Sequence, residues 1–275
     1  FTDLTMKYHP IHTNLFIKNR KNFTAKMNPS SLAVFNSNDV FTTGADSTLP
    51  FSQNRDIFYL SGADQEHTIL VLFPECPNPA HREVLFVTET NAHIAVWEGA
   101  KLTKEKATEV TGIKTVYWLS DFDKKFFEMM TQCDTIYFNT NEHYRQSVEL
   151  ETREDRFIKK AKSQFPAHNY SKAAPILQRL RAVKDQIEID LLQKACDITN
   201  AGFRRVLGFL EPGVMEYEVE AEFLYEFIRR RSDGFSYTPI IASGNNANVL
   251  HYIENNQKAE SGDLMLIDAG AQYAN

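Results

Sequence analysis

The stretch Gly262-Asp263-Leu264-Met265-Leu266-Ile267-Asp268-Ala269-Gly270 decides how the second half of the chain is expected to fold. Successive side chains of an extended strand point to opposite faces, so Leu264 and Leu266 share one face and Met265 and Ile267 share the other. A strand that is apolar on both faces is typical of a buried position in a sheet. We therefore predict a buried strand that ends at Asp268.

Asp268 is the residue of this stretch that carries chemical information. A carboxylate buried without a partner costs several kcal/mol, so a partner is expected. The spacing alone leaves four partners open: an arginine, backbone N–H groups, water at the strand end, or a metal ion. A structural role as the capping residue of the Ala269-Gly270 turn is the simpler explanation at this point.

Size and composition indicate a globular protein with a substantial core. The chain has 275 residues, of which 43% are hydrophobic, and this length suggests two domains, or one domain and a large part of another. A net charge of -6 argues against a nucleic-acid partner, which favours a basic surface. No apolar run approaches the length of a membrane span, and residues 1–20 are too polar for a signal peptide.

The cysteines and the chain ends add two expectations. Cys76, Cys133 and Cys196 are odd in number and far apart, which predicts buried free thiols in a reducing compartment, here the cytoplasm. The sequence starts at Phe1 rather than at a methionine, and it stops at Asn275 without a pattern that closes a domain. We therefore expect the chain to be part of a longer protein.

Hydrophobic periodicity predicts alternating strands and helices over residues 1–168. Expected helices cover 12–27, 103–110, 121–130 and 153–164, and expected strands cover 32–35, 57–60, 68–73, 84–87, 93–97, 115–119 and 135–138. This alternation indicates an α/β sheet domain.

The pattern changes after a polar segment at 169–175, which we interpret as a linker. Residues 176–275 are then expected to form an incomplete second domain. They carry a long helix at about 185–209, a second helix at 216–231 and strands at 239–244, 249–252 and 262–268. In the second of these helices we expect Ala221, Leu224 and Ile228 to face inward.

Several stretches resemble one protein family, in the same order along the chain. Pro50-Phe51-Ser52-Gln53-Asn54-Arg55-Asp56-Ile57-Phe58-Tyr59-Leu60-Ser61-Gly62 resembles the N-domain signature of Xaa-Pro aminopeptidases (aminopeptidase P) and their proline-dipeptidase relatives. Val249-Leu250-His251-Tyr252 and the 262–270 stretch resemble the opening of that family's catalytic domain. Residues 184–188 and 95–99 are similar to the family as well. The resemblance implies a creatinase/aminopeptidase P-type α/β N-domain followed by the first part of a pita-bread α+β catalytic domain.

The resemblance also implies a peptidase site with a pair of divalent metal ions, usually manganese. Its ligands in the family are two aspartates, a histidine and two glutamates. Asp268 matches the first aspartate, and His251 matches a histidine beside the metals that contacts the substrate. The other four ligands are expected beyond Asn275, so we expect this polypeptide alone to be inactive and not to hold the metal pair fully.

The resemblance leaves some roles open. Tyr237 and Tyr252 either shape a proline pocket or pack in the core. Trp97 either rims the active site of a neighbouring subunit, in the dimer or tetramer that is common in the family, or packs locally. Arg55 and Asp56 are expected to form a structural pair.

The function implied is release of the N-terminal residue from peptides with proline in second position. A proline dipeptidase shares the same metal site and is the first alternative. The second alternative is a pita-bread module without catalytic activity that binds peptides or histones.

Overall fold

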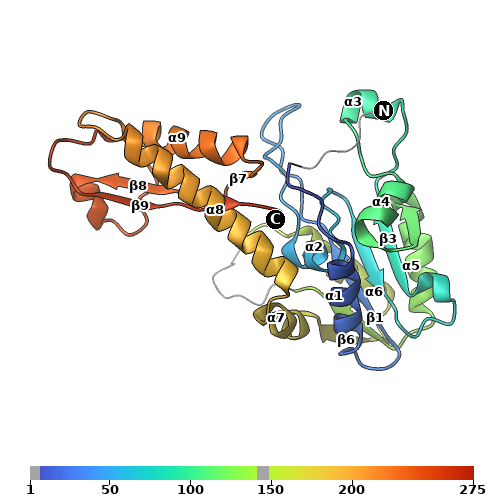
Figure 1. Ribbon diagram of the computed structural model, residues 1–275. Coiled ribbons are helices and arrows are strands. Elements are labelled where there is room, and N and C mark those ends of the chain that lie inside the picture. Colours follow the sequence, from blue (N-terminus) through green and yellow to red (C-terminus); the bar gives the residue numbers. More distant parts are fainter. Residues whose placement is uncertain (1–6, 141–148) are drawn as a thin grey trace. The chain divides into compact units, whose positions relative to one another are not determined.

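A computed structural model describes residues 7–140 and 149–275 (Figure 1). The chain divides into two compact units, which are considered separately. The first contains residues 10–184, and the second contains residues 185–275 together with the short segment 7–9. Within the described residues, no helix has both the length and the apolar character that a membrane crossing requires.

The first unit is built on a six-stranded mixed sheet, which confirms the predicted α/β class. Its strand order is β4-β3-β2-β1-β5-β6. Strand β2 runs antiparallel to β1 and β3, whereas the pairs β1–β5, β3–β4 and β5–β6 are parallel. The strands are β1 (Ser31–Asn36), β2 (Ile69–Leu72), β3 (Glu83–Val87), β4 (Thr115–Trp118), β5 (Thr135–Phe138) and β6 (Asn169–Lys172).

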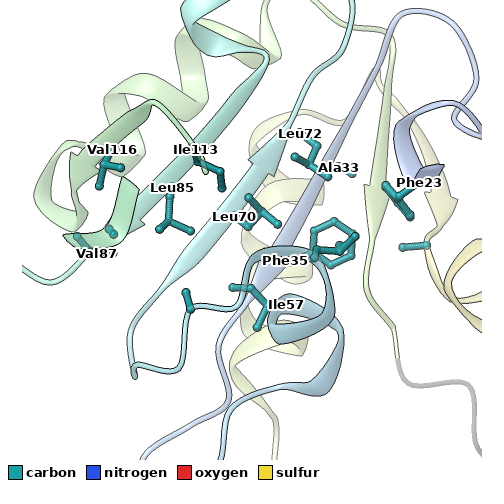
Figure 2. Close-up of a cluster of buried hydrophobic side chains, with 14 of the residues drawn as sticks. Phe23, Ala33, Phe35, Ile57, Leu70, Leu72, Leu85, Val87, Ile113 and Val116 are labelled. Carbon is teal, nitrogen blue, oxygen red and sulfur yellow. The ribbon is translucent and has the colours of Figure 1, made fainter. Parts of the chain in front are cut away.

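Helices cover both faces of this sheet because the central strands are apolar on both faces. In β1, Ala33 and Phe35 belong to one buried cluster, and Leu32 and Val34 belong to the other. Figure 2 shows the first cluster, in which Phe23 of α1 lies near Phe35. The helices of this unit are α1 (Asn14–Thr24), α2 (Arg55–Ser61), α3 (Ile94–Glu98), α4 (Lys104–Thr111), α5 (Phe122–Met130), α6 (Arg153–Gln164) and α7 (Ala174–Ala182).

Two of the predicted strands are helices. Residues 57–60 lie in α2, which begins where the Asn54 side chain accepts hydrogen bonds from two backbone N–H groups and ends at Gly62 in a left-handed conformation. Residues 93–97 overlap α3. A short apolar run is compatible with both the strand and the helix periodicity. In α2 the capping residues at both ends favour the helix.

The segment 169–175, predicted as a linker, belongs to the first unit. Asn169–Lys172 forms the edge strand β6. Helix α7 follows it and buries Leu177 in the same hydrophobic cluster as Phe35. Arg181 of α7 donates a 2.6 Å hydrogen bond to Asp56, so the partner of Asp56 is Arg181 rather than the expected Arg55. The compact second unit accordingly starts at 185, not at 176.

The second unit pairs two helices with short strands. Helices α8 (Gln186–Phe209) and α9 (Glu216–Arg229) lie side by side in Figure 1, and β8 (Ile240–Ser243) pairs antiparallel with β9 (Met265–Asp268). A second pair joins β7 (Gly234–Phe235) to β10 (Ala271–Gln272). The inward face of α9 carries Val219, Phe223 and Phe227, whereas Leu224 and Ile228 are exposed, so the predicted inward face is wrong.

The three cysteines are free, as predicted, but they are not all buried. Cys76 and Cys133 lie in the core of the first unit, where burial raises the pKa of the Cys133 thiol to about 12. Cys196 is exposed on α8, so the expectation of a buried thiol is wrong at that position.

Candidate functional site

Asp268 lies at the end of β9, on an open face of a two-stranded sheet. Met265 and Ile267 pack against the core of the second unit, whereas Leu264 is 82% and Leu266 41% exposed. Asp268 shares the exposed face. The predicted strand therefore exists, but the prediction that both of its faces are buried is wrong, because the helices cover only one face.

The partner of Asp268 is a tyrosine, which was not among the four partners considered. The Tyr237 hydroxyl donates a 2.6 Å hydrogen bond to Oδ1 of Asp268. This bond, together with burial and the carboxylate charge, raises the pKa of Tyr237 to about 12. A side chain at Gly270 would lie 3.3 Å from the Tyr237 ring, so the glycine leaves room for this contact. Tyr237 therefore contacts the candidate metal ligand, and its role in a proline pocket stays a prediction.

His251 lies in an irregular loop, not in the strand predicted at 249–252. This loop covers 249–257 and follows the short 3-10 helix η3 (Gly244–Asn248). His251 is exposed, as is Leu250 at 88%, and Tyr252 is buried. The Tyr252 hydroxyl donates a 2.6 Å hydrogen bond to Glu216. Of the two roles considered for Tyr252, the structure therefore supports packing in the interior.

Asn255 connects the loop of residues 249–257 to β8 through hydrogen bonds. Its buried side chain accepts a hydrogen bond from the N–H of Ile241 at 2.9 Å and donates to Pro239 O at 3.1 Å and to Glu220 at 2.9 Å. Its φ of 46° lies in the left-handed region, which asparagine tolerates better than most residues. A positive φ and a buried amide together explain why an asparagine occupies this position.

The described residues were compared with what a metal site requires. Among them, no three histidine, cysteine, aspartate or glutamate side chains are grouped so as to hold a metal ion. Asp268 supplies one exposed carboxylate, whose hard oxygens suit manganese or magnesium, and it stands outside any such group. Within residues 7–140 and 149–275, Asp268 therefore stays a candidate ligand without a complete coordination shell around it.

Trp97 was predicted either to rim a neighbouring subunit's active site or to pack locally. It lies on α3 and is 81% exposed, which excludes extensive local packing. Its role in an assembly stays a prediction.

Sequence reasoning missed Glu216 and Asn255, the two residues that anchor the His251 loop. Glu216 occupies the first turn of α9, where an acidic residue is ordinarily explained by the helix dipole alone. Asn255 sits in a polar run that resembles any surface loop. The only signal for Asn255 was an Asn-Asn pair at a turn.

Comparison with known proteins gives both units a family. Residues 16–137 match the model of the aminopeptidase P N-terminal domain, and residues 190–275 match metallopeptidase family M24. The Xaa-Pro aminopeptidase of Escherichia coli K12 is 29% identical over 259 residues, which cover 94% of this chain and 58% of the relative. Human Xaa-Pro aminopeptidase 3 is 27% identical over 86% of this chain and 46% of its own length. The chain thus spans about half of the length of these relatives.

Solved structures agree with these matches. Aminopeptidase P from E. coli in its low-pH form superposes with a TM-score of 0.85 at 27% identity, and covers 97% of this chain and 60% of its own. Proline aminopeptidase P II from Yersinia pestis gives a TM-score of 0.84 at 27% identity, with 96% and 61% covered. The chain therefore belongs to the aminopeptidase P family and carries its N-terminal domain followed by part of the M24 metallopeptidase domain.

Proposed function

We propose that this chain is part of a metal-dependent Xaa-Pro aminopeptidase, which releases the N-terminal residue from peptides with proline in second position. The observation that carries the proposal is the exposed Asp268 carboxylate at the end of β9, in the unit that matches family M24. The preceding aminopeptidase P N-terminal domain supports this class of M24 enzyme over others. The E. coli relative has been solved with the inhibitor Pro-Leu, which fits a substrate that contains proline.

In this proposal Asp268 is a metal ligand and His251 is a substrate-contacting residue. A pair of divalent metal ions, here manganese, supplies a hydroxide near neutral pH and polarises the scissile carbonyl when bound. Tyr237 orients one carboxylate oxygen of Asp268 through a hydrogen bond of 2.6 Å, which would prepare this side chain for ligation. His251, exposed and carried on an anchored loop, would donate a hydrogen bond to the carbonyl oxygen as negative charge develops there.

We also propose that residues 1–275 alone are inactive, since they offer one candidate metal ligand among the residues that the structure describes. The three free cysteines support a cytoplasmic location. We further propose a homo-oligomer, either a dimer or a tetramer, in which Trp97 lies at a subunit contact. The 81% exposure of the Trp97 side chain supports this.

The test uses the protein at the full length of its aminopeptidase relatives, loaded with manganese. Substrates are a tripeptide with proline second, the same tripeptide acetylated at its N-terminus, and the corresponding Xaa-Pro dipeptide. We expect the free tripeptide to lose its first residue and the acetylated one to stay intact. Cleavage of the dipeptide alone would instead indicate a proline dipeptidase. Binding of the tripeptide without cleavage would indicate a non-catalytic module.

A further inference from the structure

Glu216 is a fully buried carboxylate whose hydrogen-bond partners are all neutral donors. It is 0% exposed and lies at the first residue of α9. Its Oε1 accepts the backbone N–H and the hydroxyl of Ser243, both at 2.7 Å. Its Oε2 accepts the Tyr252 hydroxyl at 2.6 Å and the N–H of Gln257 at 2.9 Å. Both carboxylate oxygens therefore hold two donors each, which uses the acceptor capacity of an ionised carboxylate.

These four contacts join three separate segments of the second unit. Ser243 ends β8, and Tyr252 and Gln257 lie at the two ends of the loop segment that follows His251. The backbone N–H of Glu216 also donates to Gln257 O at 2.9 Å, so the contact runs in both directions. One side chain thereby fixes the residue next to His251 and the far end of the same loop.

The position of Glu216 also relates the His251 loop to the strand of Asp268. Within β8, the N–H groups of Ile241 and Ser243 point to the same side because they are two residues apart. That side faces Asn255 and Glu216, whereas Gly244, one residue further, donates to Leu264 on the β9 side. The loop is therefore anchored along one edge of β8, and β9 pairs with the other edge.

We propose that Glu216 is a positioning residue that holds His251 in place relative to Asp268. This proposal rests on the proposed function, in which His251 contacts the substrate. The chemistry requires a carboxylate, because a glutamine would turn an N–H₂ group toward two of the four donors. Burial by itself raises the pKa of Glu216, but the hydrogen bonds from Tyr252, Gln257 and Ser243 outweigh it, and its pKa is lowered on balance.

The test compares Glu216→Gln with Glu218→Gln in the full-length, manganese-loaded protein. Glu218 is a matched control because it lies on the same turn of α9, and a glutamine can keep its capping contact with Met215 N–H. We expect Glu216→Gln to lower kcat on the tripeptide about 10- to 100-fold with KM nearly unchanged, as for a displaced catalytic group. Tyr252→Phe, which removes one donor, is a milder variant in case Glu216→Gln does not fold.

A double-mutant cycle separates positioning from a general loss of structure. In a His251→Ala background, Glu216→Gln is expected to cause no further loss of kcat, because the group through which it acts is gone. An equal loss in both backgrounds would overturn the proposal.

Amide hydrogen exchange in the same proteins provides a readout that does not depend on activity. In Glu216→Gln we expect faster exchange at the Ser243 and Gln257 amides, with the Gly244 amide, which donates to Leu264 O, unchanged. Unchanged exchange at Ser243 and Gln257 would refute the positioning role whatever the activity. Absence of tripeptide cleavage by the wild type would instead refute the proposed function, and the exchange result would still show whether Glu216 holds the loop.

Discussion

Gly202 lies where α8 crosses the aromatic residues of α9, and a single added methyl group tests that packing. A Cβ at this position would lie 2.7 Å from Phe227 Cε1 and 2.8 Å from Phe223 Cδ1, and both rings are fully buried. Ordinary contacts of this kind begin near 3.4 Å, so two packed rings would have to move. Overpacking of this type costs about 1–3 kcal/mol.

Gly208 of the same helix provides the control. A Cβ there meets no atom within 4 Å, so Gly208→Ala adds a methyl group without a clash. Both substitutions gain helix propensity, about 0.5–1 kcal/mol at the interior position 202 and less at 208, the next-to-last residue of α8, so the propensity gain cancels in part. Their difference in unfolding free energy therefore reflects mainly the overpacking cost, about 1–3 kcal/mol.

Amide hydrogen exchange of α8 and α9 measures this difference within the second unit. Buried amides of α8 should exchange about 5- to 150-fold faster in Gly202→Ala than in Gly208→Ala. Equal exchange in the two variants would refute the packing of α8 on Phe223 and Phe227, and with it the support on which β8 and β9 rest.

Three further predictions concern single side chains. Burial raises the pKa of Glu154 to about 7 from a usual 4.5, so the native state binds its proton more tightly and stability falls as pH rises from about 4.5 to 7. The full shift corresponds to about 3 kcal/mol. Glu154→Gln should make the unfolding free energy less dependent on pH in this range. Urea unfolding measures this through the fluorescence of the two tryptophans, which both lie in the first unit. An unchanged pH dependence in the variant would contradict the burial of Glu154. Asp268→Asn removes the anion that raises the pKa of Tyr237, so an NMR titration should find that pKa closer to 10 than to 12; no change would argue against the contact. Asn255→Ala leaves the buried Ile241 N–H without its partner and should cost about 1–3 kcal/mol in the second unit, measured by hydrogen exchange; a neutral effect would mean that the loop is held without it.

The fold of the first unit was largely predictable because its central strands are apolar on both faces. Leu32 to Phe35, for example, alternate between the two buried clusters. The errors in this unit concern short segments, in which hydrophobic periodicity alone does not distinguish a strand from a helix or a loop. Residues 57–60 form a helix through the caps at Asn54 and Gly62, and the edge strand at 169–172 is polar and carries no hydrophobic pattern.

The sequence proposed residues for the candidate site but did not predict their environment. Asp268 and His251 were identified by resemblance, whereas the contact of Asp268 with Tyr237 joins residues 31 positions apart and leaves no local pattern. The contacts of Glu216 also leave no local pattern, because its partners lie 27 to 41 residues further along the chain. Contacts of this kind depend on how β8, β9 and the loop are arranged, and short-range periodicity does not contain that information.

Manganese bound per chain is the measurement that tests the central claim most directly. It compares Asp268→Asn with the wild type and with Asp263→Asn, in protein of the full length of the aminopeptidase relatives. Asp263 is a suitable control because it is a nearby carboxylate that accepts a hydrogen bond from the Glu260 N–H. We predict that the wild type and Asp263→Asn bind a pair of manganese ions and that Asp268→Asn loses at least one of them. Equal manganese binding by all three proteins would contradict the assignment of Asp268 as a metal ligand.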